Sequence, residues 1–179
     1  MAILLATLGL LVAEPPAGTW FFGLGLSSVH TPDQRFSGGF TAPSFPNGLG
    51  LSLEAQVESR RFFAAATVLY APQLGYAVSS IAGRVGWFVL DGEVTPYLAA
   101  GAGWLQEYFG DGDAPPNWLA ADGVALLGEV GVEAFRDARF FRAIGYLQVL
   151  WPQFEVPPYA LHAAPVTKKC LLFGVRLLF

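Results

Sequence analysis

The chain closes with the nine residues Leu171-Leu172-Phe173-Gly174-Val175-Arg176-Leu177-Leu178-Phe179. Successive side chains of a β-strand point to opposite faces. The odd-numbered positions therefore form an apolar stripe of Leu, Phe and Val, and Arg176 lies on the other face. This pattern suits a strand whose stripe contacts lipid and whose arginine faces an enclosed interior. The alternative is the last core strand of a secreted β-sandwich.

The composition favours a membrane protein. The chain is 54% hydrophobic and 13% charged, whereas soluble domains average about 25% charged residues. Its 179 residues indicate one domain. No run of about 18 apolar residues follows the N-terminal segment, so a spanning helix is not expected. A closed β-barrel is the expected alternative, because its backbone groups are all hydrogen-bonded within the sheet.

Charge and cysteine content exclude several classes of function. A net charge of −4 without a basic patch argues against nucleic acid as a partner. The single cysteine, Cys170, excludes an intrachain disulfide and a multi-cysteine metal site. Asp111 and Asp113 could ligate calcium, but an EF-hand-like loop needs more acidic ligands. The glycine pairs in 23–25 and 101–103 lack the third glycine of a dinucleotide-binding loop. We therefore expect neither a metal nor a cofactor.

The N-terminal segment has the character of a secretory signal. Residues 1–12 are almost wholly apolar, and residues 13–18 contain two prolines and small residues. A positively charged start is missing, because no Lys or Arg precedes Arg35. We expect a signal peptide over residues 1–18 and one barrel domain over residues 19–179.

Eight segments of the chain alternate between apolar and small or polar residues, as strands do. Their connections are short after the second, fourth and sixth segments and long or rich in Pro and Gly after the first, fifth and seventh. The third connection is short and breaks this rule. Short turns at one end and longer loops at the other are typical of membrane barrels. The expected strands are Thr19–Ser28, Gly48–Glu58, Phe62–Ala71, Tyr76–Val89, Thr95–Phe109, Ala120–Phe135, Phe140–Trp151 and Val166–Phe179.

Aromatic residues gather near both ends of these strands. Two aromatic belts around an apolar band are favoured at the two membrane–water interfaces. In a soluble barrel such residues would simply cap the strand ends. The expected belt near the turns comprises Trp20, Phe62, Phe63, Trp87, Tyr97, Phe135, Phe140, Phe141 and Phe179, and the belt near the loops comprises Tyr70, Tyr108, Phe109, Trp118, Trp151, Phe154 and Tyr159.

The chain resembles the small eight-stranded outer-membrane β-barrels of bacteria, in the broad group of outer-membrane proteins A and W. The resemblance rests on the stretches 96–104, 128–133 and 173–179 and covers the whole barrel segment as an architectural pattern. It implies an all-β, antiparallel, up-and-down transmembrane barrel in the outer membrane of a Gram-negative bacterium. It also implies outer-membrane lipid and the barrel-assembly machinery as partners. The residues that match the C-terminal assembly signal of this class are Phe173, Val175, Leu177 and Phe179.

Strand parity sends seven charged side chains inward, with Gln56 and Tyr146 beside them. An isolated buried charge costs several kcal/mol, so these groups should pair in a network that closes the lumen. The alternative is a narrow wet channel lined by solvated charges. The expected lumen charge network consists of Glu54, Glu58, Arg84, Glu129, Glu133, Arg142 and Arg176.

Residues typical of catalysis are scarce. His30 and His162 lie in expected loops without a serine–acid partner at a recognisable spacing. A barrel of about eight strands holds only side chains or one small ligand, which disfavours a general porin. We expect a structural barrel or one that binds a small solute or a small apolar ligand, and not an enzyme. The alternatives are a surface adhesion barrel whose outer loops bind a partner and, more remotely, a lipid-modifying enzyme.

Overall fold

The computed structural model describes residues 18–31, 34–35, 41–42, 45–73, 76–109, 118–138, 140–153 and 169–179. The expected signal peptide lies outside these residues except for Gly18. The expectations for Asp111, Asp113, His162, Phe154 and Tyr159 also fall outside them.

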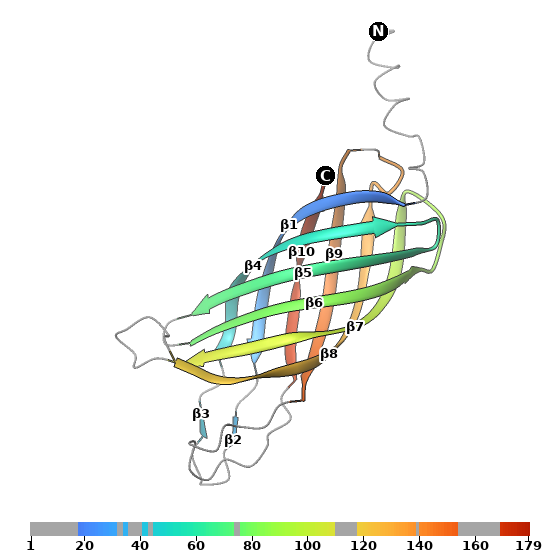
Figure 1. The fold of residues 1–179 in the computed structure, drawn as a ribbon. Coiled ribbons are helices and arrows are strands. Elements are labelled where there is room, and N and C mark those ends of the chain that lie inside the picture. The colour runs from blue at the N-terminus through green and yellow to red at the C-terminus, as the bar shows by residue number, and fades with distance from the viewer. Residues whose placement is uncertain are drawn as a thin grey trace, which may run out of the picture.

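Eight strands form one closed barrel, in which every neighbouring pair is antiparallel (Figure 1). Strands that follow one another in the chain lie side by side, and the last strand pairs with the first. This arrangement confirms the expected eight-stranded up-and-down barrel. The barrel strands are β1 (Thr19–Thr31), β4 (Phe45–Glu58), β5 (Phe62–Gln73), β6 (Tyr76–Phe88), β7 (Val94–Phe109), β8 (Trp118–Ala134), β9 (Arg142–Pro152) and β10 (Cys170–Leu178). The short strands β2 (Gln34–Arg35) and β3 (Thr41–Ala42) pair only with each other in the described chain.

The two ends of the barrel differ in their connections. At one end, which we call the turn end, residues 59–61, 89–93 and 135–141 join β4 to β5, β6 to β7 and β8 to β9. The opposite end is called the loop end. The start of β1 and the C-terminus both lie at the turn end (Figure 1).

One expected loop residue belongs to a strand. β1 continues to Thr31, and His30 pairs with Leu171 of β10. The expectation that His30 lies in a loop is therefore wrong. Continued pairing with β10 satisfies the backbone of His30 beyond the point where the apolar alternation ends.

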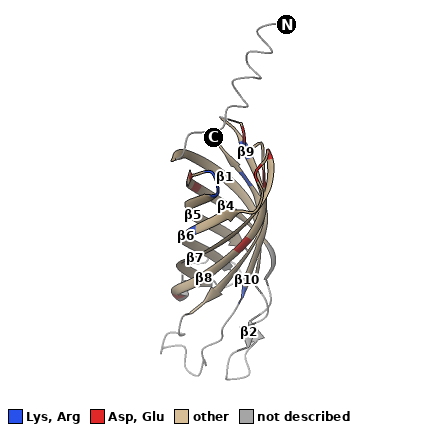
Figure 2. Ribbon diagram, turned by 90° about the vertical axis from the view of Figure 1, so that its right-hand side faces the viewer, with Lys and Arg blue, Asp and Glu red and all other residues tan. Residues whose placement is uncertain are grey.

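The outside of the barrel is apolar along the middle of the strands. Leu53, Ile81 and Val130 are 60%, 65% and 47% exposed. Most of the described wall carries no charged residue (Figure 2). Among the described residues, no helix is long and apolar enough to cross a membrane.

Two members of the expected turn-end belt lie inside the barrel instead. Phe63 and Tyr97 are 3% and 2% exposed, so their assignment to the belt is wrong. Each follows the parity of its strand, and a shift of one residue moves a side chain to the opposite face. The other seven expected members at this end, from Trp20 to Phe179, are exposed.

Candidate functional site

All seven charged side chains expected in the lumen lie inside the barrel, and each residue is at most 4% exposed. Ion pairs divide them into two groups. The central cluster consists of Glu54, Arg84, Glu129 and Arg176. The turn-end cluster consists of Glu58, Glu133 and Arg142.

In the central cluster, each guanidinium contacts both carboxylates. Arg176 donates from Nη1 and Nη2 to the two carboxylate oxygens of Glu129, both at 2.8 Å. Its Nε lies 3.1 Å from Glu54 Oε2. Arg84 Nη2 donates to Glu54 Oε1 at 2.6 Å, and Arg84 Nε lies 3.3 Å from Glu129 Oε1. Two positive and two negative groups therefore balance inside the lumen.

Thr67 of β5 ties one side of the central cluster together. Its hydroxyl accepts a hydrogen bond from Arg84 Nη1 at 2.6 Å and donates one to Glu54 Oε2 at 3.2 Å. A group that both accepts and donates completes the hydrogen bonding of an arginine and a carboxylate at once.

The other side is completed around Glu129. Tyr97 donates its hydroxyl to Glu129 Oε1 at 2.6 Å, and Gln148 Nε2 donates to Oε2 at 3.1 Å. The Tyr146 ring stacks on Arg176, whose Cζ lies 3.4 Å from the ring centroid. Through these side chains, every strand from β4 to β10 contributes to the cluster, which therefore extends across the lumen.

β1 contributes space rather than a polar group. Gly25 lies opposite Arg176 in the β1–β10 pair. A Cβ atom on Gly25 would lie 3.1 Å from Arg176 Cγ and still closer to Ser52 Oγ. A residue without a side chain at this position lets the arginine stem pass along the wall.

The turn-end cluster places two carboxylates on one arginine. Arg142 Nη1 contacts Glu133 Oε1 at 2.8 Å and also contacts Glu58 Oε2. Gln56 Nε2 donates to Glu58 Oε1 at 2.7 Å. The Arg142 guanidinium lies over the ring of Phe21, 4.0 Å from its centroid.

Three aromatic rings pack beside these clusters at the turn end. Phe63 contacts Phe88 and Tyr97, with 5.2 Å between ring centroids in both cases. The Phe63–Tyr97 pair packs edge to face, which adds about 0.5–1.5 kcal/mol beyond the burial of area, whereas the rings of Phe63 and Phe88 are tilted by 45°. Phe63, Phe88 and Tyr97 therefore pack together inside the barrel, and we call these three residues the aromatic floor. Two of them, Phe63 and Tyr97, were expected in the outer belt.

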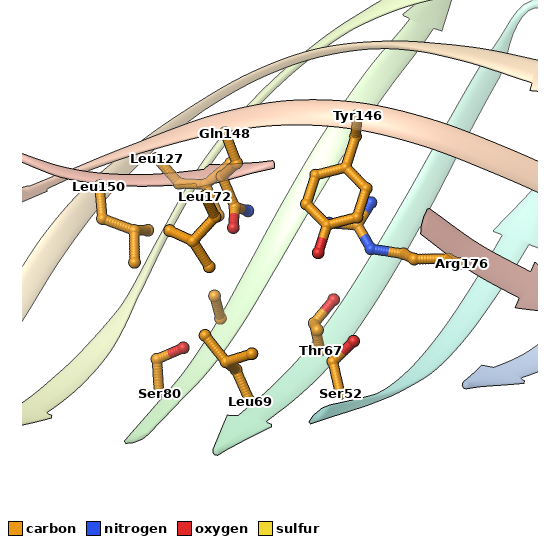
Figure 3. Close-up of a pocket in the computed structure, with 11 residues that line it drawn as sticks. Ser52, Thr67, Leu69, Ser80, Leu127, Tyr146, Gln148, Leu150, Leu172 and Arg176 are labelled. Carbon is orange, nitrogen blue, oxygen red and sulfur yellow. The ribbon is translucent and has the colours of Figure 1, made fainter. Parts of the chain in front are cut away.

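A small cavity lies beside the central cluster, towards the loop end (Figure 3). Polar groups of Ser52, Thr67 and Arg176 line one side, and leucines line the other together with Ser80 and Gln148. Its volume of about 10 Å³ is room for one water molecule. The leucines are Leu69, Leu127, Leu150 and Leu172, which belong to the apolar core of the barrel.

The four expected assembly-signal residues share the outer face of the closing strand. Phe173, Val175, Leu177 and Phe179 are 55%, 55%, 39% and 57% exposed. Phe179 also exchanges two backbone hydrogen bonds with Phe22, at 3.0 and 2.8 Å, and so extends the β1–β10 seam beyond β10.

Several residues of the lumen were not singled out from the sequence. Thr67, Tyr97 and Gln148 bind the central cluster, although only charged groups, Gln56 and Tyr146 were expected there. Strand parity places all three inward, so that signal was present. Strand parity does not place Arg136, which is described below, inside the barrel.

Comparison with known proteins identifies the fold. No family model matches the chain, and neither does any curated protein sequence. The crystal structure of Neisserial surface protein A superposes with a TM-score of 0.66 at 10% identity, over 89% of this chain and 95% of that one. The fold is that of a small bacterial outer-membrane β-barrel.

Other outer-membrane barrels give similar superpositions. OprG from Pseudomonas aeruginosa matches with a TM-score of 0.53 at 13% identity, over 93% of this chain and 99% of that one. Ail, the attachment invasion locus protein of Yersinia pestis, matches with a TM-score of 0.53 at 12% identity, over 90% and 99%. At such identities the likeness concerns the fold alone. The apolar outer wall of this barrel agrees with the membrane location expected from the sequence.

Proposed function

We propose that the protein is a structural outer-membrane barrel whose lumen is closed to ions, with the turn end facing the periplasm. The observation that carries this proposal is the central cluster. Its side chains come from seven of the eight barrel strands and bind one another across the lumen.

Opening a path through this cluster would require its ion pairs to separate. A buried charge left without its partner costs about 3–5 kcal/mol. Each guanidinium here holds two carboxylates, so moving one side chain disturbs two pairs. The paired state is therefore expected to be the resting state of the lumen.

Beside the central cluster, the space left between the described side chains favours a structural role over solute binding. The cavity beside the central cluster has room for about one water molecule. Ligand pockets usually measure about 300–1,000 Å³. A small apolar solute at this place would need the leucines around the cavity to rearrange, so we infer that this part of the lumen is structural.

Single-channel recording in planar bilayers tests this proposal. The wild-type protein, refolded and reconstituted, should show no steady conductance, while a general porin in the same membranes provides the positive control. Heat-modifiable migration on gels and recovery in the vesicles verify that the barrel is folded and inserted. Steady ion conductance through the wild-type protein would show that the lumen is open and that the proposal is wrong.

A further inference from the structure

Arg136 connects all three turns at the turn end. It lies two residues after the end of β8, and its backbone N–H donates to the carbonyl oxygen of Glu93 in the β6–β7 turn at 3.0 Å. Its Nη2 donates to the carbonyl oxygen of Arg60 and lies 3.4 Å from that of Ser59, both in the β4–β5 turn. One residue of the β8–β9 turn thus binds both other turns.

The Arg136 side chain also covers the interior. Its guanidinium lies over the ring of Phe88, 3.8 Å from the centroid, and the residue is 9% exposed. Phe88 belongs to the aromatic floor. The arginine therefore lies at the mouth of the barrel, between the turns and the packed interior.

An unusual backbone conformation brings Arg136 to this position. Glu133 faces inward, so simple alternation would send residue 135 inward and residue 136 outward. Phe135 has a φ of 61°, in the left-handed region, which is a strained conformation for an aromatic residue. The result is the reverse arrangement, with Phe135 47% exposed and Arg136 buried. Strain of this kind persists only where the surrounding structure maintains it.

We propose that Arg136 is a latch that closes the turn end of the lumen separately from the central cluster. This inference rests on the proposed closed lumen and adds a second closure to it. The acceptors of the latch are backbone carbonyls of the turns, whereas the central cluster pairs side chains inside the wall. Removing the latch should therefore expose the turn-end cluster and leave the central cluster intact.

Thiol accessibility can test the latch at both ends of one molecule. Gln56 is fully buried beside Glu58 in the turn-end cluster, and Gln56→Cys would place a thiol there. The native Cys170, buried where β10 begins near the loop end, provides an internal reference. The refolded protein in detergent micelles is treated with a small, positively charged thiosulfonate reagent. Mass spectrometry of peptides then gives the modification rate at each thiol.

Arg136→Ala, combined with Gln56→Cys, should raise the modification rate at position 56 at least tenfold and leave the rate at Cys170 unchanged. Arg61→Ala is the matched control. Its side chain is 63% exposed at the same end, pairs with Asp91 at 3.7 Å, and should change neither rate. Arg136→Gln, which also loses the guanidinium, replaces the alanine variant if that variant does not fold.

Two results would overturn the latch. An unchanged rate at position 56 in a folded Arg136 variant would show that the arginine closes nothing. An equal rise at both thiols would show general loosening of the barrel instead of local opening. Neither result bears on the conductance of the wild-type protein, so failure of the latch remains distinct from failure of the closed-lumen proposal.

Discussion

Arg176 shows what a single residue contributes to this barrel. Its guanidinium binds Glu129 in a two-bond fork, faces Glu54 and stacks on Tyr146. A buried ion pair is in itself weak evidence for stability, because removing two charges from water is costly. The loss of one partner is different, since it leaves a buried charge uncompensated.

We expect Arg176→Ala to lower the free energy of unfolding by about 3–5 kcal/mol, because Glu129 would lose its bidentate partner. Urea unfolding in lipid vesicles, followed by tryptophan fluorescence, measures this change. The control is Arg61→Ala, which breaks an exposed pair with Asp91 and should cost less than about 1 kcal/mol. A similar loss of unfolding free energy in both variants would mean that the buried ion pair stabilises the barrel no more than the exposed one.

Parity along the strands was enough to predict seven charged residues inside the barrel, because a period of two holds wherever a strand is regular. It would also have placed Glu107 of β7 inside, where that residue is 1% exposed. The same rule, had it been applied to Phe63 and Tyr97, would have placed them inside. They were instead assigned to the outer aromatic belt because they lie near the ends of their strands. Arg136 could not be predicted in this way, since the left-handed backbone at Phe135 reverses the alternation. Local sequence gives no sign of that reversal, which depends on contacts between three turns.

At the scale of the strand, the apolar outer stripes should determine insertion. Leu53 lies near the middle of β4, paired with Leu24 and Val68, whereas Val94 begins β7 at the turn end. Both side chains point outward, at 60% and 62% exposure. An arginine on the lipid face costs about 2–4 kcal/mol at the midplane and about 0–1 kcal/mol near an interface.

Leu53→Arg should therefore sharply reduce the amount of folded barrel in the membrane, whereas Val94→Arg should have little effect. Quantitative blotting of heat-modifiable protein in membrane fractions gives the comparison. Equal levels of the two variants would contradict a lipid-facing stripe on β4.

The closing strand combines a structural role with an expected signal role. Deleting Phe179 would remove two backbone hydrogen bonds to Phe22 together with the ring. Phe179→Ala keeps the backbone bonds and removes the ring, which contacts Phe141 at 5.9 Å between centroids. The substitution therefore tests the aromatic group by itself.

If Phe179 is part of an assembly signal, Phe179→Ala should lower the amount of inserted protein in cells several-fold, while its stability after refolding in vitro changes little. Phe62→Ala is the control, because Phe62 is an aromatic residue of similar exposure at the same end, 55% against 57%. Equal insertion of the two variants would leave Phe179 as an ordinary interfacial aromatic.

At the scale of the molecule, the sequence was sufficient for the strand count, the barrel topology and the end at which the short turns lie. Eight alternating segments with an even count leave few other ways to pair. The exact ends of the strands could not be predicted from the sequence. β1 runs past the apolar alternation to His30 because its partner strand continues there. Pairing between strands distant in sequence thus decides what alternation alone cannot.

An integral barrel should separate with the outer membrane. We expect the protein in the outer-membrane fraction, resistant to high salt and alkaline carbonate and released only by detergent, because the outer wall is apolar. A peripheral protein from the same membranes, released by carbonate, is the control. Recovery from the periplasm without detergent would contradict the outer-membrane location.

The β1–β10 seam also sets the order in which the barrel can form. Each of the other pairings, from β1–β4 to β8–β9 and β9–β10, joins barrel strands that follow one another along the chain. The seam instead joins opposite ends of the chain, such as Leu24 with Leu177, and carries the largest loop-closure entropy. Distant pairings slow folding, so this step should limit the refolding rate. Arg176 of β10 can pair with Glu129 of β8 before the seam forms, because β8, β9 and β10 are neighbours. Its contact with Glu54 of β4 lies across the seam and should form only when the barrel closes.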